Sequence, residues 1–155
     1  MLKKAVTEYK YSGDIYNNLG TSYFSTSRYD SAIYFYSKAL ECQPNTALYW
    51  ANRGGVKFFT KDYMGALSDY NKSLEIDPNS VNSWYNIGNT KLNIQDYEGA
   101  IASYNKVITM DPENGEAFYH RGLAFTKINK TSDANIDFIK AKELGIQNNK
   151  YETNY

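Results

Sequence analysis

A repeat of 34 residues constrains this chain more than any other feature of its sequence. Glycine returns at this step as Gly20, Gly54, Gly88 and Gly122, and alanine as Ala32, Ala66, Ala100 and Ala134. Periods between about 20 and 50 residues are typical of proteins built from stacked structural repeats. The sequence therefore predicts four repeats, at residues 13–46, 47–80, 81–114 and 115–148. Positions within a repeat are numbered here from its first residue.

Each repeat holds two runs of apolar residues at helical spacing, separated by turn-prone segments such as "TSRYD" and "NIQDY". Proline follows the second run at Pro44, Pro78 and Pro112. Proline cannot donate a backbone hydrogen bond and disfavours helix at the residue before it, so it ends the second helix. Each repeat is therefore predicted to be a helix, a short turn and an antiparallel helix.

Small and large residues alternate at fixed repeat positions. Glycine at position 8 and alanine at position 20 are small where the two helices of a pair are expected to cross closely. Large side chains stand at position 24, as Tyr36, Tyr70, Tyr104 and Phe138. We expect these rings to fill the space beside the glycines.

The spacing of Trp50 or Trp84, Gly88, Tyr97, Ala100, Tyr104 and Pro112 resembles the tetratricopeptide repeat (TPR) family over residues 13–148. The resemblance implies an all-α fold, a right-handed superhelix (solenoid) of helix pairs. It also implies that the first helices line a concave groove, which in this family typically binds another protein. Three departures are visible: Lys57 and Lys91 replace an aromatic residue, Thr131 replaces a tyrosine, and repeat 4 lacks the closing proline.

The two ends of the repeat array differ from its middle. The second helices of repeats 1 to 3 carry apolar residues at positions 21 and 28, such as Ile33 and Leu40, which the next repeat would cover. Repeat 4 has Asn135 and Lys142 there, so its terminal face is predicted to be polar and the array to stop. Residues 149–155 form a polar tail. Residues 1–12 match a second-helix pattern and are either a half-repeat that acts as an N-terminal cap or the edge of a longer array.

Composition argues against several classes of function. The chain has 17 basic and 17 acidic residues, so no basic field would draw it to nucleic acid or to anionic lipid. No stretch approaches the roughly 20 apolar residues of a membrane span, and no signal-peptide core is present. Membrane insertion is therefore not expected, and a cytoplasmic location is favoured while the compartment stays open.

Catalytic and metal chemistry find no support in the residue pattern. One histidine and one cysteine, His120 and Cys42, cannot form a metal site at ligand spacing, and no third group is placed to activate a nucleophile. Gly54-Gly55 lies within a helical pattern and lacks the lysine of a phosphate-binding loop. We therefore expect no enzyme activity, no metal and no cofactor.

The predicted groove face comprises positions 2, 5, 6, 9 and 13 of each repeat, one helical stripe. Position 6 carries Asn18, Asn52, Asn86 and His120, one in each repeat. An asparagine amide both donates and accepts, so it can pair with the backbone of an extended peptide without reading its sequence. The hypothesis is an asparagine ladder that binds a partner protein; the alternatives are compositional bias and capping of neighbouring loops.

Amide contacts alone would bind weakly, because about 0.5–1.5 kcal/mol each corresponds to roughly millimolar affinity for three contacts. Apolar anchors are therefore needed, and the same face offers Phe59, Tyr85, Tyr119 and Leu123, with Asn89 beside them. Arg53 and Arg121 stand next to the ladder. They either orient its amides or cover helix surface with their stems.

One branch of the TPR family binds the acidic tails of Hsp70 and Hsp90 through lysine, arginine and asparagine. In the two possible registers the corresponding positions here are Asn17, Thr21, Asn52, Asn82 and Asn86, or Ala51, Gly55, Asn86, Glu116 and His120. Without cations to offset its desolvation, an acidic tail is not expected as the ligand.

Two other roles remain open beside peptide binding. The array could be a structural spacer, or it could self-associate through Leu2 and Val6 at its N-terminal edge, although a monomer is expected. It could also be the interaction part of a larger enzyme or membrane protein.

Overall fold

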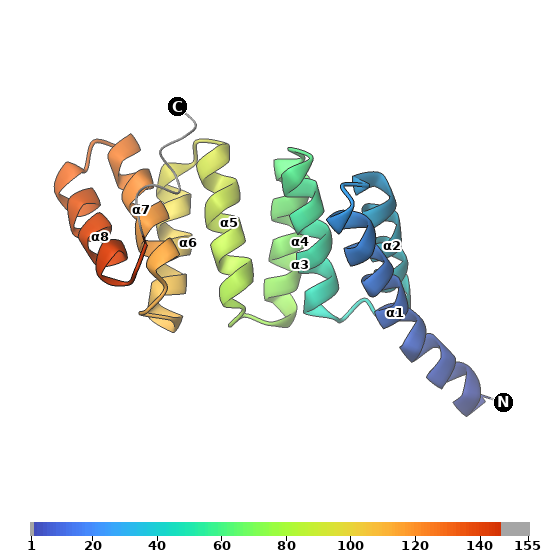
Figure 1. The fold of residues 1–155 in the computed structure, drawn as a ribbon. Coiled ribbons are helices and arrows are strands. Elements are labelled where there is room, and N and C mark those ends of the chain that lie inside the picture. The colour runs from blue at the N-terminus through green and yellow to red at the C-terminus, as the bar shows by residue number, and fades with distance from the viewer. Residues whose placement is uncertain (1, 147–155) are drawn as a thin grey trace. The chain divides into compact units, whose positions relative to one another are not determined.

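The computed structural model describes the backbone of residues 2–146 and the side chains of residues 13–146. This part of the chain is all helical (Figure 1), with no strand. The helices are α1 (Leu2–Ser25), α2 (Tyr29–Cys42), α3 (Ala47–Phe59), α4 (Tyr63–Ile76), α5 (Val81–Asn93), α6 (Tyr97–Met110), α7 (Gly115–Lys127) and α8 (Thr131–Glu143). The predicted all-α repeat fold is thus confirmed. The chain divides into two compact units, residues 1–83 and 84–155, which are described separately below.

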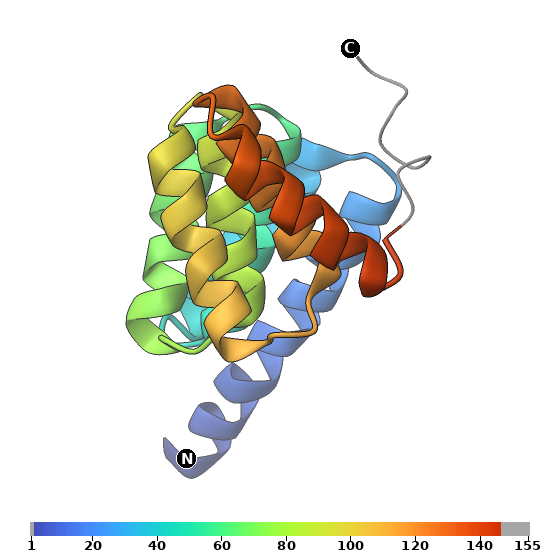
Figure 2. The same ribbon diagram turned by 90° about the vertical axis from the view of Figure 1, so that its left-hand side faces the viewer.

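Inside each repeat a ring packs where the glycine leaves space. A Cβ atom built on Gly54 would lie 2.9 Å from the Tyr70 ring, and one on Gly122 would lie 2.7 Å from the Phe138 ring (Figure 2 views this last helix pair). The Gly20–Tyr36 and Gly88–Tyr104 pairs are equally close, at 2.7 and 2.6 Å. The predicted contact between small and large residues is therefore confirmed in all four repeats.

The turn between the two helices of each repeat uses a left-handed backbone conformation. The residue at position 15 has a φ between 57° and 64° in every repeat, as Ser27, Lys61, Gln95 and Asn129. In repeats 2 and 3 the next residue caps the second helix: the Asp62 and Asp96 carboxylates accept hydrogen bonds at 3.0 Å from the backbone N–H groups of Gly65 and Gly99. The sharp turn and the cap together set where the second helix begins.

The N-terminal segment differs from the sequence-based expectation. Residues 2–12 are continuous with α1, so no turn separates them as a second helix of an earlier repeat (Figure 1). Gly13 does not end the helix, because a helical glycine costs only about 1 kcal/mol relative to alanine. The side chains of Leu2 and Val6, and the tail at residues 149–155, lie outside the described part of the chain.

The outer surface of α8 carries polar and apolar residues together. Asn135 and Lys142 are exposed, as the predicted polar terminal face requires. Ile136 and Ile139 on the same helix are also largely exposed, which the sequence analysis did not anticipate. Among the described residues, no helix combines the length and the apolar character needed to cross a bilayer.

Candidate functional site

First helices of neighbouring repeats meet with an offset of one residue. In unit 1 the Asn52 side-chain amide donates to Asn17 Oδ1 at 2.8 Å, and the Tyr49 hydroxyl donates to Asp14. In unit 2 the Tyr85 hydroxyl lies 3.3 Å from His120 Nδ1. Each contact joins residues 35 apart in the sequence, one more than the repeat length. Position 6 of a repeat therefore faces position 5 of the preceding repeat within these units.

Unit 1 presents amides and exposed apolar side chains on one face. Asn18 is exposed, and Asn52 is half-buried beside the buried Asn17. The bond to Asn17 uses one of the two amide protons of Asn52. Phe59 is 61% exposed and Leu48 57% exposed, and both lie on the same stripe of α3 as Asn52. Along the stripe, the Asn52 amide therefore lies between two apolar side chains, those of Leu48 and Phe59.

Phe59 is held in place by other rings. Its ring centroid lies 5.1 Å from that of Phe24, 6.2 Å from that of Phe58 and 6.5 Å from that of Tyr29. Neighbouring rings restrict the side chain without covering it. Such a partly supported, exposed aromatic ring loses little rotamer freedom when a partner packs against it.

Unit 2 gathers tyrosines around the single histidine. The centroid of His120 lies 5.7 Å from that of Tyr85, 6.1 Å from that of Tyr104 and 5.5 Å from that of Tyr119. Asn89 Oδ1 accepts a hydrogen bond at 2.7 Å from the Tyr104 hydroxyl. Of the predicted anchors, Tyr119 is only 9% exposed and its ring packs against Phe138. Tyr119 therefore packs beside His120 and has little exposed surface with which to contact a partner.

The His120 ring and the Tyr85 phenol of this cluster are uncharged at neutral pH, and burial strengthens this preference. Desolvation lowers the pKa of His120 and raises the pKa of Tyr85 to about 12. His120 Nδ1 lies 2.9 Å from the Glu116 carbonyl oxygen, and since a carbonyl only accepts, this bond places a proton on Nδ1. The other two predicted residues on this face, Asn86 and Leu123, are half-buried. The polar side chains among these thus offer neutral hydrogen-bonding groups beside the Glu116 carboxylate, which lies 3.9 Å from His120 Nδ1.

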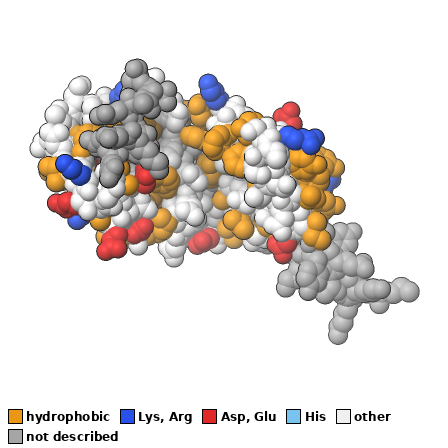
Figure 3. Space-filling model, in the orientation of Figure 1, with side chains coloured by type: hydrophobic (Ala, Val, Ile, Leu, Met, Phe, Trp, Pro, Cys, Tyr) orange, Lys and Arg blue, Asp and Glu red, His pale blue; other side chains and the backbone are white. Residues whose placement is uncertain are grey.

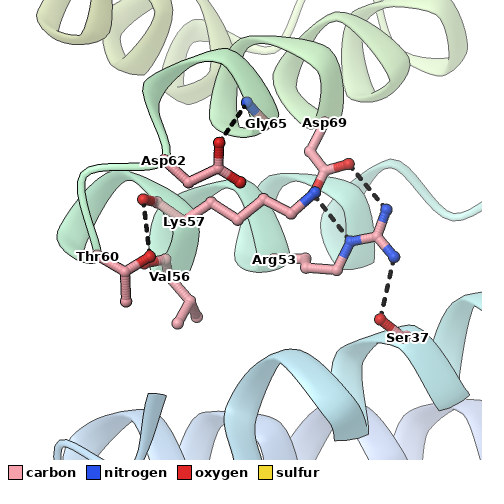
Figure 4. Close-up of polar contacts among 8 residues, drawn as sticks. All are labelled: Ser37, Arg53, Val56, Lys57, Thr60, Asp62, Gly65 and Asp69. Atoms are coloured by element: carbon pink, nitrogen blue, oxygen red, sulfur yellow. Dashed lines mark hydrogen bonds and ion pairs between the residues drawn. The ribbon is translucent and has the colours of Figure 1, made fainter. Parts of the chain in front are cut away.

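Arg53 serves a different purpose from either one considered for it in the sequence analysis. Its Nε and Nη2 atoms donate to Asp69 at 2.8 Å each, and Lys57 Nζ also lies 2.8 Å from Asp69 (Figure 4). Its Nη1 donates to Ser37 of α2 at 3.0 Å. Asp69 is 2% exposed, so this is a buried ion pair and not an arm that orients the ladder amides.

Arg121 repeats this arrangement in unit 2. Its Nε and Nη2 donate to the buried Asp137 at 2.7 Å each, and its Nη1 donates to Asn105 of α6 at 2.5 Å. The sequence does carry a signal for this pair. Arginine at position 7 occurs together with aspartate at position 23 in repeats 2 and 4, whereas repeats 1 and 3 lack both residues.

Four basic groups of the first helices lie against carboxylates. Arg53 and Lys57 face Asp69, Arg121 faces Asp137, and Lys91 Nζ lies 3.7 Å from Asp96. In the described part of α1 there is no lysine or arginine. Within residues 13–146, no cluster of three or more His, Cys, Asp or Glu side chains could hold a metal ion.

Sequence profiles described as "Tetratricopeptide repeat" match residues 13–46, 47–80 and 69–102, and one described as "TPR repeat" matches residues 92–129. The chain belongs to the tetratricopeptide repeat family. The matches at 13–46 and 47–80 have the boundaries predicted for repeats 1 and 2. The TPR fold is that of a protein–protein interaction module. No curated protein sequence matches this TPR protein.

Several solved structures share the TPR fold of this chain. The crystal structure of MamA has a TM-score of 0.84 at 21% identity, covering 96% of this chain and 87% of that one. The first TPR of Spaghetti (RPAP3), bound to the HSP90 peptide SRMEEVD, has a TM-score of 0.75 at 24% identity, covering 76% and 94%. PilF from Pseudomonas aeruginosa has a TM-score of 0.80 at 25% identity, covering 89% and 63%. At these identities the likeness establishes the fold.

Proposed function

We propose that this TPR protein is a non-catalytic adaptor that binds an extended, largely uncharged segment of another protein along the first-helix face of its repeats. The observation that carries the proposal is the stripe on α3, where Asn52 lies between the exposed side chains of Leu48 and Phe59. An amide between two apolar anchors pairs with a peptide backbone while the anchors bury apolar side chains of the partner.

The spacing of the stripe suggests what the partner segment looks like. Leu48 and Phe59 are eleven residues apart in α3, about 16 Å along the helix axis. An extended chain covers that distance with about five residues. The proposed ligand therefore carries two apolar side chains about five residues apart, with few charges between them.

Unit 2 would add neutral hydrogen-bonding groups of the same kind. Tyr85, Asn89 and His120 belong to one face, the Tyr85 phenol is neutral at neutral pH, and burial lowers the pKa of His120 so that its ring is neutral as well. The buried Tyr119 ring packs against His120. Binding to unit 2 is therefore also expected to favour uncharged segments.

An acidic ligand is a poor fit for both units. The Spaghetti domain was solved with the acidic peptide SRMEEVD bound. In this chain Arg53 and Lys57 both face Asp69, Lys91 faces Asp96, and Arg121 faces Asp137. A peptide carboxylate would have to compete with those internal carboxylates, or lose its hydration without a counter-charge.

A phage-displayed library of random peptides, selected on the full chain, provides a probe that needs no prior partner. Selected peptides are expected to be poor in Asp and Glu and rich in apolar residues. Phe59→Ala should weaken their binding at least about tenfold in fluorescence anisotropy, because a central aromatic anchor is lost. Asn18→Ala should weaken binding about threefold, the effect of one neutral hydrogen bond.

Tyr34→Ala is the matched control, because Tyr34 is an equally exposed ring on a second helix. It should leave the affinity unchanged. Unfolding midpoints of all variants would separate lost contacts from lost structure. Selected peptides that bind Phe59→Ala and Asn18→Ala as tightly as the wild type would overturn the proposal, and so would tight binding of SRMEEVD.

A further inference from the structure

Neighbouring repeats contact each other at defined positions, and unit 1 shows how. Val56 at position 10 of repeat 2 is buried in a cluster against which Ile33, at position 21 of repeat 1, packs. Arg53 at position 7 donates to Ser37 at position 25. An apolar pair and a polar pair therefore lie side by side where α3 covers α2.

Unit 2 uses the same positions where α7 meets α6. Arg121 at position 7 donates to Asn105 at position 25. Ala124 at position 10 and Ala117 at position 3 are fully buried. The contact between a second helix and the next first helix is thus a recurring interface, polar at positions 25 and 7.

The same positions are open on α1. Ile15 at position 3 is 57% exposed and Leu19 at position 7 is 38% exposed. In α3, position 3 is Tyr49, which is buried in a cluster with Ala39 and Leu40 of α2, and position 7 of both α3 and α7 donates to the preceding second helix. Ser22 at position 10 is also exposed. Hydrophobic side chains do reach the surface over α1 and α2 (Figure 3). The face of α1 that a preceding second helix would cover is therefore apolar and accessible.

The last helix has a matching open face. Position 21 is the exposed Asn135, and position 25 is Ile139, which is 62% exposed. Position 28 is the exposed Lys142, where repeat 1 has the buried Leu40. Positions 21 and 28 are therefore polar on α8 and apolar on α2, whereas position 25 is apolar on α8 and polar on α2.

The residue types that change on the open face of α1 match those that change on the open face of α8. Position 21 of a second helix meets position 10 of the next first helix. Both are apolar inside unit 1, and both are polar at the open faces, as Asn135 on α8 and Ser22 on α1. Positions 25 and 7 are both polar inside the units, and both apolar at the open faces, as Ile139 and Leu19. At position 28 the stem of Lys142 can lie along an apolar neighbour while its ammonium group stays in water.

From this complementarity we propose that α8 of one molecule docks against α1 of a second copy, in the register in which α3 covers α2. The contact is heterologous, so each molecule keeps one free face of each kind and further copies can add. Few apolar side chains take part, so dissociation is expected at roughly 100 µM. A molecule expected to be monomeric when dilute then forms chains when concentrated.

Sedimentation velocity of the full chain between about 10 µM and 1 mM tests the proposal. The wild type should show a weight-average mass that rises steadily with concentration. Ile139→Asn, which restores the residue of repeat 3, and Leu19→Lys should each weaken association at least about tenfold. Tyr34→Ser, at an exposed ring on α2, should leave the mass unchanged.

Mixing the two variants gives the decisive result. Ile139→Asn keeps an intact α1 face, and Leu19→Lys keeps an intact α8 face, so an equimolar mixture should form one-to-one dimers and nothing longer. Dimers in the mixture, with both variants monomeric alone, would support head-to-tail contact.

Three results would overturn the proposal. One is a wild type that stays monomeric to about 1 mM, and another is an Ile139→Asn variant that associates like the wild type. The third is a mixture without dimers, which would mean that the α1 and α8 faces do not bind each other.

Discussion

Two adjacent glycines on α3 show how differently the same residue can contribute. A Cβ atom on Gly54 would lie 2.9 Å from Tyr70 Cε1 and 3.3 Å from the Ala66 carbonyl oxygen. A Cβ atom on Gly55 would meet only the Tyr70 hydroxyl, at 3.8 Å. The Tyr70 ring is buried, so little space is open to it on the other side. Gly54 is therefore required by packing, whereas Gly55 contributes only its flexibility.

Gly54→Ala and Gly55→Ala are predicted to change stability in opposite directions. In a helix interior, alanine raises the free energy of unfolding by about 0.5–1 kcal/mol relative to glycine. At Gly54 this gain is outweighed by an overpacking cost of about 1–3 kcal/mol, so the variant should be destabilised. At Gly55 the gain should appear as added stability. Urea unfolding measures both, and equal shifts for the two variants would show that the Tyr70 ring yields.

Residue identity predicted the glycine contacts but not the buried ion pairs. The glycines and rings were visible because all four repeats share them. Asp69 and Asp137 occur in only two repeats, and a carboxylate is normally expected in solvent. Their burial depends on an arginine sixteen residues earlier, on the facing helix of the same repeat.

At the scale of elements, helices and turns followed from the sequence, but the turn geometry did not. Left-handed backbone is usually signalled by glycine, yet position 15 carries serine, lysine, glutamine or asparagine. No residue pattern therefore indicated it. The continuity of α1 also did not follow from the sequence, because the period of 34 places a repeat boundary at residue 13 and the helix passes through it.

The left-handed turns give a prediction at this scale. Lys61 has a φ of 64°, a conformation that costs an L-residue about 1 kcal/mol or more. Lys61→Gly relieves this strain and, after the added freedom of the unfolded chain, should stabilise the protein by about 0.5 kcal/mol. Lys106→Gly, in the middle of α6, is the control and should destabilise it by about 1 kcal/mol. Thermal unfolding compares the two, and destabilisation by both would show that the turn is unstrained.

For the molecule as a whole, the candidate site could be predicted only in part. The period of 34 placed Asn52 and His120 on the first-helix face, because helical periodicity fixes which residues share a face. It could not give the offset of one residue that pairs Asn52 with Asn17, and His120 with Tyr85. That offset depends on how one repeat packs on the next, which side-chain volumes decide together.

The same packing makes the stability of the whole chain depend on pH through its single histidine. Burial lowers the pKa of His120 in the folded protein, while the unfolded chain keeps a value near 6.5. Above that pH both states leave the ring neutral. As the pH falls below it, the unfolded chain binds the proton first, so the free energy of unfolding decreases until the folded pKa is passed.

His120→Asn, which restores the residue of the other three repeats at position 6, should remove this component. Urea unfolding at about pH 7.5 and pH 5 is then expected to show a smaller loss of stability in the variant than in the wild type. Contributions from groups that do not contact residue 120 are common to both proteins and cancel in the comparison. The Glu116 carboxylate, 3.9 Å from His120 Nδ1, acts in the opposite direction by favouring the charged ring. A wild type that loses less stability than the variant would therefore mean that Glu116 outweighs burial.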